Sequence, residues 1–207
     1  MRGLLLKDWY YMKNYCKVFW GIIVVFIIAA CFTEGKQFFL YYPCILSGMI
    51  SMTLIAYEEK EGWNVYAGTL PISRTQIVSS KYMVSLIFSG FVVAAMLLVQ
   101  LATMLYRQAF DGFGMINLAT SLIPLSLLPT AILLPFIYKF GAEKGRMVYY
   151  VVVGLFCGLF IVLGNMGIFE TSLASIKYSN VVLCSIAIVV FGISWLLSIG
   201  FYQEKEI

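Results

Sequence analysis

The segment YMVSLIFSGFVVAAMLLVQLATMLY, at positions 82–106, contains no charged residue. Folded as an α-helix it would extend about 37 Å, which exceeds the roughly 30 Å thickness of a bilayer's hydrocarbon core. Strands of a membrane barrel would instead alternate apolar and polar residues, and this segment is continuously apolar. It therefore predicts a transmembrane helix whose backbone polar groups are all satisfied internally.

The rest of the chain repeats this pattern. Of the 207 residues, 62% are hydrophobic and 12% are charged, which is more apolar surface than a soluble domain of this size can bury. The charges fall in clusters, and the runs between them predict an all-α fold. We expect a single transmembrane domain over 1–207, with six spans near 16–33, 37–57, 82–106, 112–138, 147–169 and 178–203.

The basic residues predict how the chain is oriented. With both termini in the cytoplasm, only Lys36, Arg107 and Lys177 of the 14 lysines and arginines lie outside. This asymmetry follows the positive-inside rule. The net charge of +4 is explained by basic residues beside the membrane, so no nucleic-acid partner is expected.

Several classes of function are disfavoured by residues that the sequence lacks. It has no histidine, and its 5 cysteines lie in or beside predicted spans, so no disulfide framework, metal site or haem site is expected. Ion-coupled carriers usually keep charged groups near the middle of their spans, and here Lys17, at the edge of the first span, is the one Asp, Glu, Lys or Arg within the predicted bounds. Paired Glu58 and Glu59 resemble the glutamates of CAAX-type membrane proteases, but that chemistry also needs histidine. The sequence also lacks a G-x-x-x-x-G-K-[ST] loop for ATP.

Two polar segments carry their own patterns. Residues 1–17 place Leu5, Trp9, Met12 and Cys16 on one helical face, which predicts an interfacial helix lying flat on the inner membrane surface. The cytoplasmic elbow, residues 58–81, contains two predicted helices. Trp63, Tyr66, Ala67 and Leu70 follow helical spacing before Pro71, and Ser73 with Gln76 forms a capping box for a second helix that continues into the third span.

Two further features concern movement and packing. Pro124, Pro129 and Pro135 predict a bend or break in the fourth span, which would act either as a hinge or as a static kink. In the fifth span, Gly154 and Gly158 form a GxxxG pattern that allows a second helix to approach closely, within one copy or between two.

The layout resembles the type-two ABC exporter permeases of bacteria. The sequence-specific part of the resemblance is Tyr57-Glu58-Glu59-Lys60-Glu61-Gly62-Trp63, then Leu70-Pro71-Ile72-Ser73-Arg74, Ile77-Val78 and Lys81-Tyr82. The chain is most similar to the short permeases of peptide exporters, including exporters of phenol-soluble-modulin toxins. It lacks the sizeable outer region that some larger members carry between spans five and six.

The resemblance implies a non-enzymatic, multi-pass permease subunit in the bacterial plasma membrane. It would bind no cofactor itself and would pair with a second permease copy, either identical or related. Each copy would dock on a cytoplasmic ATP-binding subunit that holds ATP and magnesium, and would export an amphipathic or hydrophobic substrate such as a peptide. The elbow would be the coupling helix, and we expect it to contact the ATPase through Glu58, Glu59, Trp63, Leu70, Pro71 and Arg74. The alternative is a free-standing bacteriocin immunity or sensor protein of the membrane, which needs no nucleotide.

Overall fold

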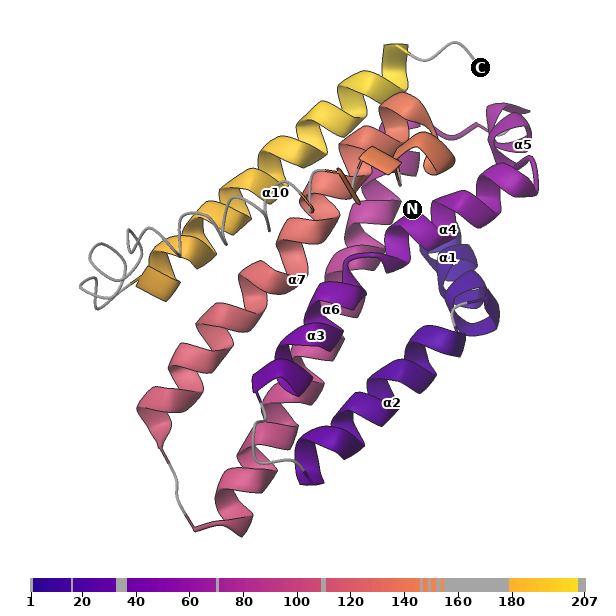
Figure 1. Ribbon diagram of the computed structural model, residues 1–207. Helices are drawn as coiled ribbons and strands as arrows, with labels where there is room; N and C mark the ends of the chain where they lie inside the picture. Colours follow the sequence, from indigo (N-terminus) through magenta and orange to yellow (C-terminus); the bar gives the residue numbers. More distant parts are fainter. Residues whose placement is uncertain are drawn as a thin grey trace.

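The architecture is a bundle of helices (Figure 1). The computed structural model describes residues 2–15, 17–32, 37–69, 71–108, 111–145, 147–148, 150–151, 154 and 179–204. Within these ranges the principal helices are α1 (Arg2–Tyr15), α2 (Lys17–Phe32), α3 (Gln37–Ser47), α4 (Ile50–Lys60), α5 (Trp63–Thr69), α6 (Arg74–Tyr106), α7 (Gly112–Phe140) and α10 (Ser179–Glu204). No strand occurs in the described part of the chain, in agreement with the predicted all-α class.

Four segments are long and apolar enough to cross a membrane. They are Phe38–Lys60, Arg74–Tyr106, Gly112–Phe140 and Asn180–Gln203. Helices α1 and α2 meet at a bend of 66°, and together they would form a fifth membrane span if the pair counts as one. The predicted span 147–169 falls mostly outside the described residues, so the count of six spans remains a prediction.

The second span is divided where it meets α7. Helix α3 ends at Ser47 and α4 begins at Ile50, with a turn at Gly48 and Met49. A Cβ atom on Gly48 would lie 2.7 Å from the Cβ of Pro129, which is closer than real Cβ atoms approach. Glycine therefore lets α7 contact the turn directly.

Helix α7 runs without interruption through its three prolines, so of the predicted bend or break, a break does not occur, and a bend remains a prediction. Because Pro135 has no N–H, the carbonyl of Ala131 loses its partner within the helix. Ser194 of α10 supplies the missing donor, with its Oγ 2.6 Å from that carbonyl oxygen. A hydroxyl from a neighbouring helix therefore maintains the span. The role of these prolines as a hinge remains a prediction.

The same serine belongs to a hydrogen-bond chain between α6 and α10. Tyr82 Oη lies 2.7 Å from the Oγ atoms of both Ser194 and Ser198. Since the Ser194 hydroxyl donates to α7, it accepts from Tyr82, and Ser198 then donates to Tyr82. The Tyr82 ring also stacks on Trp195, with centroids 5.4 Å apart. These contacts join α6, α7 and α10 in the apolar interior.

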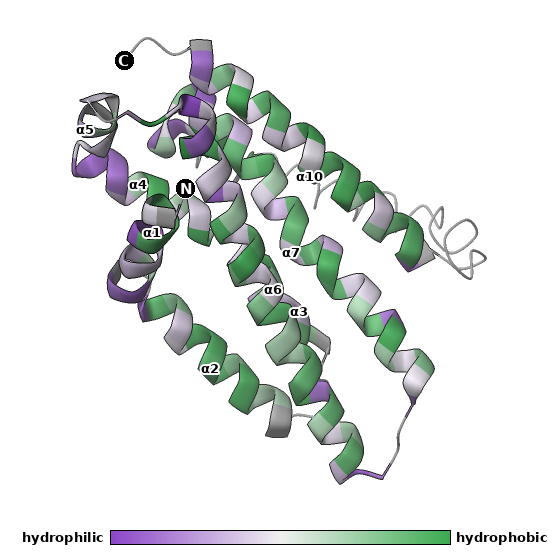
Figure 2. Ribbon diagram, turned by 180° about the vertical axis from the view of Figure 1, so that it is seen from behind, coloured by the Kyte–Doolittle hydropathy of each residue, from purple (hydrophilic) through white to green (hydrophobic). Residues whose placement is uncertain are grey.

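One end of the bundle is polar. The elbow, residues 141–145 and the last turn of α10 lie together at this end, whereas the α6–α7 connection lies at the other (Figure 1). The long helices are mostly hydrophobic, and hydrophilic residues gather around α1, α4 and α5 (Figure 2). We call this the polar end. The prediction that it faces the cytoplasm remains untested.

The GxxxG pattern is only partly visible. A Cβ atom on Gly154 would meet no atom within 4 Å, and Gly158 lies outside the described residues. The described part of the chain therefore places no close helix contact at Gly154.

Candidate functional site

The elbow has the two helices that its sequence predicts. Gly62 adopts a positive φ of 70° after α4, and α5 follows from Trp63 to Thr69. Ser73 then caps the next helix, its Oγ accepting the backbone N–H of Gln76 at 3.3 Å. That helix is α6, whose 33 residues extend about 50 Å without interruption. A force applied at the start of α6 would therefore act directly on a membrane span.

Four charged side chains meet at the base of the elbow and form what we call the ionic cluster: Lys7 and Asp8 of α1, Glu58 of α4 and Lys81 of α6. The Lys81 ammonium lies 2.6 Å from Asp8 Oδ1 and 2.5 Å from Glu58 Oε1. Lys7 donates a further hydrogen bond to Glu58. The cluster thus joins three helices that are distant in sequence.

The cluster is withdrawn from water and balanced in charge. The side chains of Asp8, Lys81 and Glu58 are 0%, 3% and 5% exposed. Removing such charges from water is costly, so the arrangement is stable only while each charge keeps its partners. Burial raises the pKa of the Asp8 carboxyl, and the nearby Lys81 opposes that shift. Burial likewise lowers the pKa of Lys7.

Helix α1 also contacts the elbow through aromatic rings. The Lys7 ammonium lies 3.4 Å from the centre of the Trp63 ring, a cation–π contact. Trp63 in turn packs against Tyr66, with ring centroids 5.4 Å apart. Tyr11 donates a hydrogen bond to Glu61 just before α5. The N-terminal helix is therefore attached to the elbow at several points.

The face of α1 that packs against the rest of the chain differs from the apolar stripe predicted to face the membrane, and that prediction remains untested. The buried positions are Leu4, Asp8 and Met12, whereas Trp9 is 51% exposed. Of the predicted stripe, Met12 is buried, Leu5 is partly buried and Cys16 lies outside the described residues. Hydrophobic periodicity places an aspartate outward, but Lys81 provides a buried partner that turns Asp8 inward.

Two other contacts fasten the elbow. Glu59 Oε2 accepts the backbone N–H of Ala142 at 2.9 Å, beyond the end of α7. Arg74 donates to the carbonyl of Gln203 at 2.8 Å, near the end of α10. The elbow is therefore joined to both ends of the chain and to the segment that follows α7.

The six residues predicted for ATPase contact thus have different surroundings. Glu58, Glu59, Trp63 and Arg74 all contact other parts of this chain. Pro71 is exposed, and Leu70 lies outside the described residues. Asp8 is absent from the residues predicted from sequence, and Lys81 belongs to the family resemblance without a predicted role. The available signal was that Asp8 is the one acidic residue among the basic residues of 1–17.

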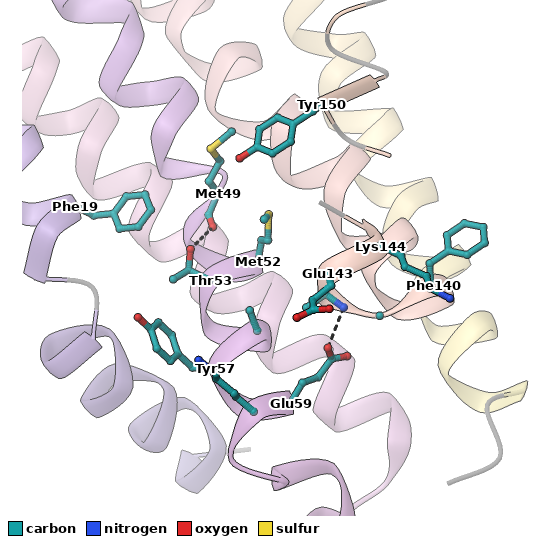
Figure 3. A pocket seen from close by; sticks show the side chains of 14 residues that line it. Phe19, Met49, Met52, Thr53, Tyr57, Glu59, Phe140, Glu143, Lys144 and Tyr150 are labelled. Carbon is teal, nitrogen blue, oxygen red and sulfur yellow. Dashed lines mark hydrogen bonds between the residues drawn. The ribbon is translucent and has the colours of Figure 1, made fainter. Parts of the chain in front are cut away.

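A cavity of about 810 Å³ opens beside the elbow (Figure 3). Its apolar wall includes Phe19, Met49, Met52 and Ala56, and charged residues border it. The charged side chains are Glu59, Lys60, Glu143 and Lys144. Its size falls within the range of small-molecule sites, and its walls suit a molecule with apolar and polar parts. Among the described residues, no group of three or more His, Cys, Asp or Glu could hold a metal ion.

Comparison with known proteins gives one result that covers nearly the whole chain. Residues 3–203 match the family model described as ABC-2 family transporter protein. Comparison with curated proteins gives no match. The matched region includes the ionic cluster, the elbow and all the spans that the structure describes. The chain belongs to the ABC-2 family of transporter proteins.

Proposed function

We propose that this chain is the permease subunit of an ATP-binding-cassette exporter. It would move an amphipathic or hydrophobic substrate, such as a peptide, across the bacterial plasma membrane. Membrane components of the ABC-2 family generally work with an ATP-binding subunit, which supports this assignment. A separate subunit would therefore supply the energy.

The observation that carries the proposal is the exposed side of the elbow. Tyr66 of α5 is 57% exposed, and Pro71 is exposed in the turn that follows. Tyrosine is frequent among residues that dominate binding at protein interfaces. Trp63, one turn earlier in α5 and packed against Tyr66, is partly buried and contacts Lys7 of α1. We therefore assign the ATPase contact to Tyr66 and Pro71.

The remaining predicted residues would then carry movement into the membrane. The ionic cluster joins α4 and α6 to α1, Glu59 joins α4 to residue Ala142, and Arg74 joins α6 to α10. Closure of two ATP-binding subunits around ATP would displace α5. Because these contacts bind the elbow on three sides, the displacement would move the polar ends of several helices together.

The cavity beside the elbow supports an amphipathic substrate. Apolar side chains of α2 and α4 would accept the apolar face of a peptide, and the charged border would accept its polar groups. Both acidic and basic groups lie on that border, so the cavity is not specific for a single sign of charge. It lies next to Glu59, so elbow movement would alter its shape.

Reconstitution tests the proposal. The chain would be placed in proteoliposomes with a candidate ATP-binding subunit, and peptide-stimulated ATP hydrolysis and export would be measured. Tyr66→Asp should abolish both, as should Trp63→Ala combined with Arg74→Glu. Tyr106→Asp is the matched control, because Tyr106 is 91% exposed at the opposite end of the bundle.

Unchanged stimulation in the Tyr66 variant would contradict the proposed contact. If the purified chain never retains an ATP-binding subunit, the free-standing immunity or sensor function would replace the exporter.

A further inference from the structure

An apolar groove runs between α1 and α6 on the outer side of the bundle. Its volume is about 360 Å³, and it is lined by Leu5, Leu6, Trp9, Met12, Val84 and Ile87. No polar or charged residue lines it, and Leu6, Trp9 and Ile87 are exposed. None of the four charged residues of the ionic cluster lines the groove.

A second hollow, of about 330 Å³, adjoins this groove. It is lined by Trp9, Met12, Lys13 and Trp20, so the two hollows share Trp9 and Met12 as walls. The second hollow adds Lys13, which is a cation, and Trp20, which has an indole ring. An apolar channel therefore ends beside a positive charge.

Lys13 has no anionic partner within the described part of the chain. The ion pairs there involve Lys7 and Lys81, which pair with Asp8 and Glu58. Lys17 adds a second exposed positive charge at the start of α2. The junction between α1 and α2 is therefore basic, and it suits an anionic group better than a neutral one.

Trp20 is held in place beside Lys13. Its ring makes edge contacts with Phe88 and Phe91 of α6, at centroid distances of 5.4 and 5.6 Å. Tryptophan is favoured at the level of lipid headgroups, where one edge meets polar groups and the other meets hydrocarbon. The hollow around Lys13 is therefore a fixed part of the fold.

We propose that the two hollows form one binding site for an anionic phospholipid of the surrounding membrane. One acyl chain lies in the groove between α1 and α6. The phosphate of the headgroup contacts the Lys13 ammonium between Trp9 and Trp20. The lipid thereby covers the outer face of α1, whose other face is fixed by the ionic cluster.

The site is tested by lipid binding to the full chain, which does not depend on transport. Purified protein in detergent is titrated with phosphatidylglycerol and, separately, with phosphatidylcholine of the same acyl chains, and bound lipid is counted by native mass spectrometry. We expect phosphatidylglycerol to bind more tightly. Lys13→Gln should weaken its binding about fivefold, the factor expected for one basic residue at an anionic surface.

Two further variants separate the groove from the charge. Ile87→Trp fills the groove and should weaken binding of both lipids, because the acyl chain is displaced. Lys139→Gln removes an exposed lysine at the end of α7, outside both hollows and the cavity beside the elbow, and should leave binding unchanged. Circular dichroism of each variant confirms that it is folded.

The proposal is overturned if both lipids bind equally, or if Lys13→Gln behaves like Lys139→Gln. It is also overturned if a Leu6→Cys variant forms a disulfide with a second copy of the chain in the membrane, because a protein partner would then cover the groove.

Discussion

Replacing Lys81 by methionine is expected to destabilise the protein by about 3 kcal/mol, the lower part of the range for removing one partner from a buried ion pair. Among the described residues, the Lys81 ammonium is the one cation within hydrogen-bond distance of both carboxylates, at 2.6 Å from Asp8 and 2.5 Å from Glu58. Without Lys81, Lys7 must balance two buried negative charges, and the Lys7 ammonium lies 3.8 Å from Asp8 Oδ1. Asp8 would then be fully buried without a close partner.

Reversible unfolding in mixed detergent micelles would measure this change in the free energy of unfolding. Lys144→Met is the control, because it removes an exposed lysine and should have little effect. Adding Asp8→Asn to Lys81→Met removes the stranded carboxylate and leaves Lys7 with Glu58. This double variant should be more stable, by about 1–3 kcal/mol, than the sum of the two single effects predicts. A Lys81 variant as stable as the Lys144 control, or strictly additive effects, would refute the ionic cluster as a coupled unit.

Two further predictions concern packing within the membrane, and both are measured by the same unfolding assay. Ser194→Ala should lower the free energy of unfolding by about 1–2 kcal/mol, because it removes the donor to the Ala131 carbonyl that Pro135 leaves without an N–H partner. The loss should be smaller in a Pro135→Ala background, where the helix supplies its own N–H. An equal loss in both backgrounds would contradict this explanation. Gly48→Ala should lower the free energy of unfolding by about 1–3 kcal/mol, because the new Cβ would collide with Pro129. Gly90→Ala is the control: its Cβ would meet no atom within 4 Å, so the change should be neutral or stabilising. Similar effects at both glycines would count against the close contact.

The local features of the elbow could be predicted from sequence because each depends on residues close together. The capping box at Ser73 fixes the start of α6, and the spacing of Trp63, Tyr66 and Ala67 indicates α5. The charge-free run at 82–106 likewise predicts a span whatever its neighbours are.

The contacts of the elbow could not be predicted, because they depend on residues brought together by the fold. Glu58 resembles a solvated charge at a helix end, and only the approach of Lys7 and Lys81 buries it. The continuity of α7 also depends on another helix, since Ser194 accommodates the effect of Pro135. Periodicity describes one helix at a time and does not identify such partners.

In the proposed exporter, an ATP-binding subunit contacts the exposed Tyr66 of α5. The most direct test places a photo-crosslinking amino acid at Tyr66 in the intact membrane and identifies the adduct by mass spectrometry, with Tyr106 at the opposite end as control. We predict that Tyr66 crosslinks to a subunit bearing a Walker motif and that Tyr106 does not. If Tyr66 forms no such adduct, or if both positions form it equally, the elbow is not the contact through which ATP hydrolysis drives transport.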